Sequence, residues 1–259
     1  MPTEIQTSAD QAKATGYKAP DNLLDNKTIL VTGAGDGIGA QAAKTYAAHG
    51  ATVILTGKTI AKLEKVYDEI TAAKNPEPAI YPIDFSGASV DDYANMADTL
   101  EENFGQLDGL LHNAAQLGLM TPLASYTPKD WVTTLHTNLT APFLLTQALI
   151  PLLMKAENAS IVFTTDSVGQ NPNAYWGAYG ASKAGIDNLM VTLAEELENT
   201  TKIRVNSIDP GGIRTNFRRN AFPGEVPTES PLPEAIMPCY LYLMGNDSLA
   251  THKQTIAAQ

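Results

Sequence analysis

From residue 27 onward, short apolar runs alternate with longer segments whose apolar side chains recur every three or four positions. The short runs predict strands at 28–32, 52–56, 79–83, 107–112, 160–165, 203–208 and 254–257. The periodic segments predict helices at 38–49, 59–73, 89–104, 128–155, 178–199 and 233–244. Uniformly apolar strands that alternate with helices indicate a parallel sheet covered on both faces. We therefore predict one doubly wound (Rossmann) α/β domain over residues 25–259, with about seven parallel strands.

Residues 1–24 are polar and lack this periodicity, so we predict a flexible N-terminal arm there. The arm has no apolar core and does not resemble a secretory signal. The longest apolar stretch, residues 141–154, is interrupted by Pro142 and Pro151 and is too short to span a bilayer. The single cysteine, Cys239, permits no intramolecular disulfide. We therefore expect a cytoplasmic protein.

The chain of 259 residues carries a formal net charge of −11 at pH 7. Nucleic acids and anionic membranes are bound by clustered Lys and Arg, so this acidic balance disfavours both as partners. We expect a small-molecule ligand instead, and no metal site.

The segment Thr32-Gly-Ala-Gly-Asp-Gly-Ile-Gly39 joins the first predicted strand to the first predicted helix. Gly33 permits a tight turn, Gly37 lets the backbone approach a pyrophosphate, and Gly39 lets helix and strand pack closely. The helix N-terminus adds N–H donors and a partial positive charge. The pattern predicts a dinucleotide site, and a glycine-rich turn without a ligand is the alternative. Asp36 lies inside the turn, where a carboxylate disfavours a nearby phosphate.

The second predicted strand ends in Leu55-Thr56-Gly57-Lys58. It lacks the acidic residue that holds the ribose 2′-hydroxyl in NAD-dependent proteins of this design. Lys58 offers a positive charge to a 2′-phosphate instead. We therefore predict that NADP(H) is preferred and that NAD(H) binding remains possible. The alternative is that Lys58 is a solvated surface lysine.

Tyr179 and Lys183 lie four residues apart in the run Gly177-Ala-Tyr-Gly-Ala-Ser-Lys-Ala-Gly185, inside a predicted helix. Residues at this spacing share one helix face. A tyrosine followed by a lysine in this way indicates proton transfer beside the dinucleotide. Together with the glycine turn, the pair predicts a nicotinamide oxidoreductase.

Several further motifs join this pair: the glycine turn, His112-Asn-Ala-Ala115, Asn138 and Pro210-Gly-Gly-Ile-Arg-Thr215. The set resembles the short-chain dehydrogenase/reductase family over roughly residues 27–257. The stretches 176–183 and 236–245 further resemble the bacterial YciK-like oxidoreductases. The resemblance implies a carbonyl or alcohol substrate, a nicotinamide cofactor and a homodimer or homotetramer.

The resemblance also implies roles for single residues. Tyr179 would deliver or remove the proton at the substrate oxygen. Lys183 would lower the tyrosine pKa through its charge and hold the ribose hydroxyls of the nicotinamide. Asn138 would hold a water that extends the proton relay. The implied cofactor contacts are the glycine turn with Ile38, Asp84 near the adenine, and Asn113, Ala114, Pro210, Gly211, Ile213 and Thr215.

The family places a serine thirteen residues before the tyrosine, and Asp166 occupies that position here. An ionised aspartate accepts hydrogen bonds and cannot donate one. Beside a developing alkoxide it would repel charge, and it would raise the pKa of Tyr179. A protonated Asp166 is one possible donor. Ser167 is another if the strand end is shifted, since alternation turns both neighbours of residue 166 to the opposite face. The sequence leaves these alternatives open.

The predicted function is therefore an NADP-dependent oxidoreductase that transfers a hydride between nicotinamide and a carbonyl or alcohol substrate. Tyr179 is the predicted proton donor or acceptor. The alternative, kept open by Asp166, is a dinucleotide-binding protein with little or no catalysis that acts as a sensor or scaffold. The sequence does not identify the substrate.

Overall fold

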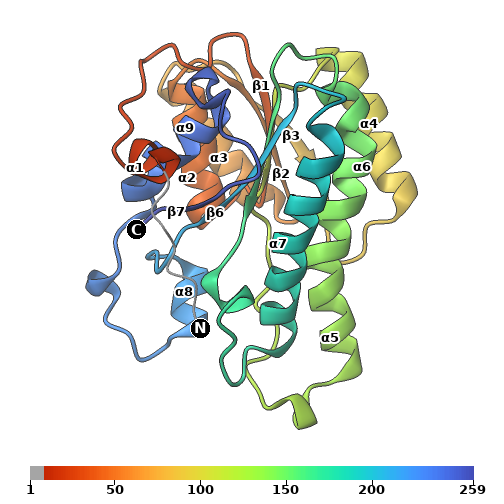
Figure 1. Ribbon diagram of the computed structural model, residues 1–259, viewed down its shortest axis with the longest axis vertical. Helices are drawn as coiled ribbons and strands as arrows, with labels where there is room; N and C mark the ends of the chain where they lie inside the picture. Colours follow the sequence, from red (N-terminus) through yellow and green to blue (C-terminus); the bar gives the residue numbers. More distant parts are fainter. Residues whose placement is uncertain (1–8) are drawn as a thin grey trace.

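A parallel sheet runs through the centre of the computed structural model, which describes residues 9–259 (Figure 1). Its strands are β1 Thr28–Thr32, β2 Thr52–Gly57, β3 Ala79–Pro82, β4 Gly109–His112, β5 Ser160–Thr164, β6 Arg204–Asp209 and β7 Thr255–Ala257. They lie in the order β3-β2-β1-β4-β5-β6-β7, and every neighbouring pair is parallel. The predicted doubly wound sheet is confirmed. The strand order reverses between β1 and β4, where sheets of this kind bind their ligands.

Helices cover both faces of the sheet. Figure 1 shows α2, α3 and α9 on one side and α4, α6 and α7 on the other. Their bounds are α2 Gly37–Ala48, α3 Ile60–Ala72, α4 Val90–Phe104, α6 Ala141–Leu153, α7 Gly177–Leu197 and α9 Met237–Met244. Successive strand residues enter opposite layers, so Val31 packs in the core beneath α2, α3 and α9, while Leu30 packs beneath α4, α6 and α7. Burial on both faces explains the uniformly apolar strands.

The N-terminus of α4 shows how local sequence sets a boundary. The Ser89 hydroxyl accepts from the Asp92 backbone N–H, and the Asp92 carboxylate accepts from the Ser89 N–H at 2.7 Å. This reciprocal pair satisfies N–H groups that the helix cannot pair internally. The capping box therefore starts the helix directly after Ser89.

The predicted helix over 128–155 is divided into three parts. An α-helix, α5 Pro128–Leu135, passes into a π-helical segment, His136–Thr140, and then into α6. Single π turns widen the backbone spiral and occur frequently at functional sites. The π segment contains Asn138, one of the predicted site residues.

The described part of the predicted arm is docked on the domain. A short helix, α1 Ala9–Thr15, packs against α9, and both Ala14 and Leu24 are fully buried. The Gln11 side chain exchanges two hydrogen bonds with the backbone of Ala257 in β7. Residues 9–24 thus differ from the flexible arm expected from their lack of periodicity, because a few anchoring side chains suffice to hold them. Residues 1–8 of the predicted arm lie outside the described residues.

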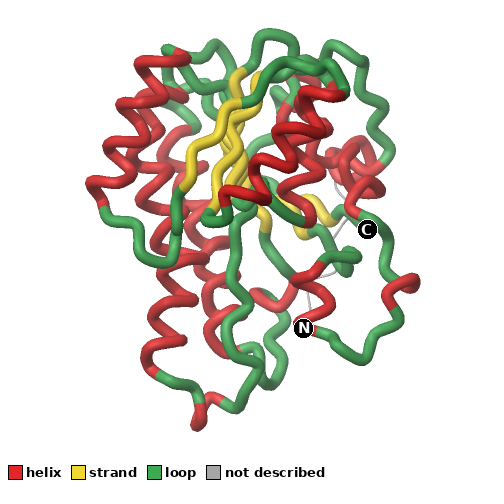
Figure 2. Tube along the Cα trace, turned by 180° about the vertical axis from the view of Figure 1, so that it is seen from behind, coloured by secondary structure: helices red, strands yellow, loops and turns green. Residues whose placement is uncertain are grey.

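The functional end of the molecule lies beyond the carboxyl ends of the strands. Figure 2 shows long loops and short helices gathered there. They include residues 113–127, the segment 165–176, and a third segment that carries helix α8 Asn216–Ala221. Within residues 9–259, no helix has both the length and the apolar character needed to cross a membrane.

Candidate active site

A cavity of about 540 Å³ opens at the carboxyl ends of the strands, between the turn after β1 and helix α8. The predicted site residues that line it are Gly33, Asp36, Gly37, Ile38, Lys58, Asp84, Asn113, Ala114, Asp166, Tyr179, Lys183, Pro210, Gly211, Ile213 and Thr215. Gly39, Asn138 and Ser167 are predicted site residues that do not line it. Residues from distant parts of the sequence thus meet around one space.

The glycine turn forms one end of this cavity. Gly33 and Gly37 adopt φ values of +68° and +54°, which side chains disfavour. A Cβ on Gly39 would lie 2.3 Å from the Gly33 carbonyl oxygen, so helix α2 packs directly against the turn. The backbone is therefore exposed to the cavity at the start of α2, where a pyrophosphate would be held.

Thr32 at the end of β1 ties this turn to the end of β4. Its hydroxyl accepts hydrogen bonds from the backbone N–H groups of Asn113 and Ala114, at 2.9 and 3.0 Å. The Asn113 side chain donates back to the Thr32 carbonyl at 3.3 Å. These bonds fix the cavity wall at the point where the strand order reverses. Thr32 was not among the predicted site residues, although a hydroxyl at the end of a buried strand was a usable signal.

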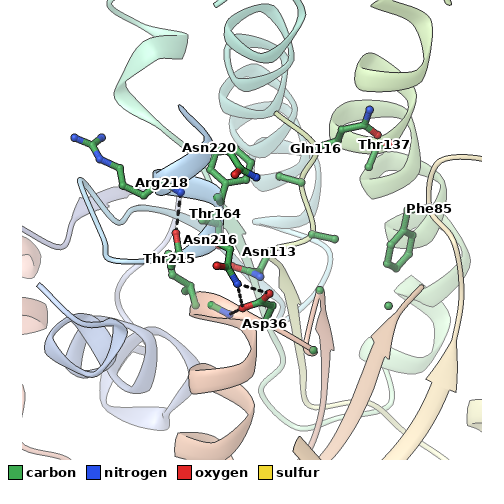
Figure 3. A pocket seen from close by; sticks show the side chains of 18 of the residues that line it. Asp36, Phe85, Asn113, Gln116, Thr137, Thr164, Thr215, Asn216, Arg218 and Asn220 are labelled. Carbon is green, nitrogen blue, oxygen red and sulfur yellow. Dashed lines mark hydrogen bonds between the residues drawn. The ribbon is translucent and has the colours of Figure 1, made fainter. Parts of the chain in front are cut away.

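Asp36 does not stand unpaired in the glycine turn (Figure 3). Lys62 of α3 forms an ion pair with it at 2.6 Å, and the Asn216 amide of α8 donates to it at 3.0 Å. Burial alone would raise the pKa of Asp36, but these bonds outweigh burial and leave the pKa lowered. The expected conflict between this carboxylate and a phosphate is thereby reduced. Lys62 was missed, although it lies four residues after Lys58 and lines the same cavity.

The opposite wall of the cofactor end is formed by the loop after β3. The Asp84 carboxylate accepts hydrogen bonds from the backbone N–H and the hydroxyl of Ser86, at 3.0 and 2.8 Å. The backbone bond and then the hydroxyl lower the pKa of Asp84. Phe85 follows it and reaches the cavity (Figure 3). Asp84 therefore shapes the loop as a turn former as well as lining the cavity.

Tyr179 and Lys183 lie on the cavity face of α7, where both are largely buried. The Lys183 Nζ donates to the Thr164 carbonyl at 2.6 Å and lies 5.5 Å from the centre of the Tyr179 ring. Burial lowers the pKa of Lys183 to about 8, although the carboxylates of Asp166, Asp187 and Asp209 work in the opposite direction. The lysine charge is therefore retained at neutral pH and lost in mild alkali.

Asp166 faces the tyrosine directly. The Tyr179 hydroxyl donates to one carboxylate oxygen at 3.1 Å, and the Val168 N–H donates to the other at 3.0 Å. Burial, and then the charge and hydrogen bond of Asp166, raise the pKa of Tyr179 well above its ordinary value. Ser167 is exposed and lies outside the cavity, so it does not take the place of Asp166 in this structure. Thr165 points to Asp187 instead.

Asn138 lies behind the cavity and supports it. Its side chain accepts from the Gln116 N–H at 2.7 Å and donates to the Gln116 carbonyl at 2.8 Å. A third bond runs from its amide to the Ser182 hydroxyl at 3.0 Å. Asn138 thus joins the π segment to α7 and fixes Gln116, which does line the cavity. The implied contact with a water stays a prediction.

Aromatic rings from α8 and from the start of α7 enclose the tyrosine end. Trp176 and Phe217 lie 5.6 and 5.4 Å from the Tyr179 ring, measured between ring centres. Phe222 lies 5.5 Å from Trp176. Arg218 stacks on Phe222 and is also bound to Glu225 through two hydrogen bonds of 2.7 and 2.8 Å. The two phenylalanines were not among the site residues predicted from the sequence.

Comparisons with known proteins agree with this geometry. The sequence model for the short chain dehydrogenases matches residues 27–226. The chain is 43% identical to the oxidoreductase YciK of Escherichia coli (strain K12), over 94% of this chain and 96% of that protein. A short chain dehydrogenase structure from Pseudomonas syringae is 50% identical, with a TM-score of 0.92 and coverage of 94% and 98%.

The chain belongs to the short-chain dehydrogenase/reductase family. It is a nicotinamide-dependent oxidoreductase of the YciK-like subgroup. A structure from Escherichia coli CFT073, described as complexed with NADPH, is 44% identical and has a TM-score of 0.90, with coverage of 93% and 100%. In this chain the carboxylate of Asp166 lies beside Tyr179 and accepts a hydrogen bond from its hydroxyl.

Proposed function

We propose that this chain catalyses NADP(H)-dependent hydride transfer between the nicotinamide and a carbonyl or alcohol group, with the proton exchanged at Tyr179. The observation that carries the proposal is the placement of Tyr179 and Lys183 in the same cavity as the glycine turn. A dinucleotide with its phosphates at the start of α2 would extend along this cavity toward the tyrosine. The exposed glycine backbone at that end fits such a group.

The bound cofactor would supply the hydride. The Tyr179 hydroxyl is the proton-bearing group that would meet the substrate oxygen. The Lys183 ammonium is held at the tyrosine by the Thr164 carbonyl and would favour the phenolate once the proton has moved. Trp176 and Phe217 lie against the Tyr179 ring and would shield this end of the cavity from water, which would strengthen both electrostatic effects.

The preference for NADP(H) is supported by two lysines at the end of β2 and the start of α3. Lys58 and Lys62 both line the cofactor end of the cavity. Lys62 is partly committed to Asp36, which leaves Lys58 as the charge without an ion pair among the described residues. The 44% identical protein complexed with NADPH supports the same preference.

The test is the consumption of NADPH in the presence of a panel of ketones, aldehydes and quinones, with the alcohol product identified. We expect consumption that depends on both the carbonyl compound and the protein. Tight NADPH binding without turnover on any panel member would instead favour a sensor or scaffold. The hydrogen bond between Tyr179 and Asp166 is the observation that favours this second function.

We also propose that the chain forms homo-oligomers through α5, α6 and α7. These helices, with the residue that follows α6, expose large apolar side chains on the surface of the domain: Val132, Phe143, Met154 and Val191. Exposed apolar side chains that gather on neighbouring elements mark association surfaces. Symmetric self-association is the commonest way for such a face to be covered.

A further inference from the structure

The tyrosine end of the cavity carries an excess of negative charge. Asp166, Asp187 and Asp209 all lie close enough to Lys183 to favour its charged form. A second cation nearby, Arg218, is already bound to Glu225 by two hydrogen bonds. All three carboxylates therefore act on the lysine electrostatically, and Asp166 is the one that also lines the cavity. A cation entering this end would be attracted, and an anion forming there would be repelled.

The Asp166 carboxylate has a defined position in this field. It lines the cavity, and each of its oxygens accepts one hydrogen bond, from Tyr179 and from Val168. A carboxylate has about four acceptor sites, so both oxygens can accept further donors. The Tyr179 hydroxyl, in turn, points its proton at Asp166. Carbonyl reduction needs that proton on the substrate side and produces an alkoxide-like oxygen beside a negative charge.

The aromatic rings around this carboxylate are suited to a cation as well. Trp176 and Phe217 both line the cavity within 6 Å of the Tyr179 ring centre. The faces of Trp, Tyr and Phe rings attract cations, most strongly in sites from which water is excluded. Phe222 already does so, because the Arg218 guanidinium lies 3.8 Å above its ring. A carboxylate inside an aromatic enclosure is the arrangement that recognises an organic cation.

We propose that, besides carbonyl groups, this site reduces protonated imines and prefers them, with Asp166 as the counter-ion of the iminium. The proposal rests on the proposed function, because it uses the same cavity and the same hydride donor. The hydride forms a C–H bond at the imine carbon, the C=N π bond breaks, and its electron pair becomes the lone pair of the amine nitrogen. NADPH is oxidised to NADP⁺, and the positive charge of the iminium is lost.

Asp166 promotes this reaction by favouring the reactive form of the substrate. A protonated imine accepts hydride far more readily than the neutral imine. The carboxylate would accept a hydrogen bond from the N–H of the iminium and so hold it in its charged state. Because the imine enters the reaction already protonated, no proton is required from Tyr179. The tyrosine then acts as a positioning residue that holds Asp166 through its hydroxyl.

The test compares two bicyclic substrates of similar size, 3,4-dihydroisoquinoline and 1-tetralone, with NADPH as the reductant. The first presents a C=N group that is protonated in mild acid, and the second presents a neutral C=O group. Wild type, Asp166→Ser and Asp166→Asn are measured, together with Asp68→Ser as a matched change on the exposed face of α3. We expect wild type to favour the imine in kcat/KM by at least about a hundredfold, the scale of one electrostatic partner in an active site.

Asp166→Ser should lower kcat/KM for the imine by about a hundredfold and raise it for tetralone, whereas Asp68→Ser should change neither. Asp166→Asn should lose imine reduction as well, since its amide carries no charge. Tyr179→Phe supplies an independent readout. It should abolish tetralone reduction and retain most of the imine reduction, because only the carbonyl reaction takes a proton from the phenol.

Equal use of the two substrates by wild type, or an equal loss of both in Asp166→Ser, would overturn the imine proposal and leave the proposed function standing. Tight NADPH binding with no reduction of either substrate in wild type and in Asp166→Ser would overturn both. Binding gives a second measurement that does not need turnover. Protonated tetrahydroisoquinoline should bind the NADP⁺ complex at least about tenfold more tightly in wild type than in Asp166→Ser, and equal affinities would contradict the counter-ion role.

Discussion

Replacing His112 with glutamine should remove part of the acid sensitivity of the fold. The His112 ring is buried at the end of β4, stacks on Phe163 at 4.6 Å between centres, and pairs its Nε2 with the Thr146 hydroxyl at 2.8 Å. Burial lowers the pKa of His112 from 6.5 to about 3. The folded protein therefore keeps this ring neutral, while the unfolded chain takes up a proton below pH 6.5.

The sign and size of the effect follow from this difference. The contribution of the neutral His112 ring to the free energy of unfolding is fully present above pH 6.5 and is lost progressively as the pH falls toward 3. At 1.36 kcal/mol per pKa unit, the whole shift amounts to about 5 kcal/mol, and about 2 kcal/mol of it is lost by pH 5. A loss of 2 kcal/mol is a large fraction of the stability of an ordinary domain.

The assay is urea unfolding at pH 7 and at pH 5 for wild type, His112→Gln and His49→Gln. Glutamine can still bond to Thr146 but takes up no proton, so the comparison concerns the change with pH and not the stability at one pH. Between pH 7 and pH 5, wild type should lose about 2 kcal/mol more than His112→Gln. The half-buried His49, at the end of α2, supplies the matched histidine-to-glutamine control. Parallel losses in wild type and His112→Gln would refute the reasoning.

Three further predictions concern the site and the assembly. Wild type should bind NADPH more tightly than NADH, and Lys58→Asp should reverse that order by removing the charge offered to the 2′-phosphate; fluorescence titration with an unchanged preference would contradict this. Carbonyl reduction should fall about tenfold per pH unit above pH 8, since the pKa of Lys183 is about 8 and its charge is lost there; a rate profile flat to pH 10 would exclude this role. Light scattering should give a dimer or tetramer mass, and Val132→Lys should lower it, whereas a monomeric wild type would refute the association face.

The strands and the glycine turn could be predicted from the sequence because their signals are local. Leu30 and Val31 are both buried, one in each core layer, so β1 reads as an unbroken apolar run. The turn from Gly33 to Gly39 needs glycines because its backbone adopts positive φ angles and packs too closely for a Cβ atom. The spacing of these glycines is visible in the sequence itself. The position of Asp166 followed from the family resemblance, which places a serine thirteen residues before the tyrosine, but the hydrogen bond from Tyr179 did not.

The side-chain contacts that shape the site join segments that are far apart in the sequence, so no local sequence pattern predicts them. Asp36 meets Lys62 and Asn216 from two other elements. Phe217 reaches Tyr179 only because α8 folds back over the cavity. These pairings depend on how helices pack around the sheet, which residue periodicity alone does not specify.

The most direct test of the central claim is a single-turnover measurement on Tyr179→Phe, with the best carbonyl substrate of the panel and bound NADPH. The phenylalanine keeps the ring that packs against Trp176 and Phe217 and removes only the hydroxyl. We predict an unchanged affinity for NADPH and a hydride-transfer rate lower by at least about a hundredfold. Carbonyl reduction at a rate close to wild type, with NADPH bound normally, would contradict the assignment of the proton to Tyr179.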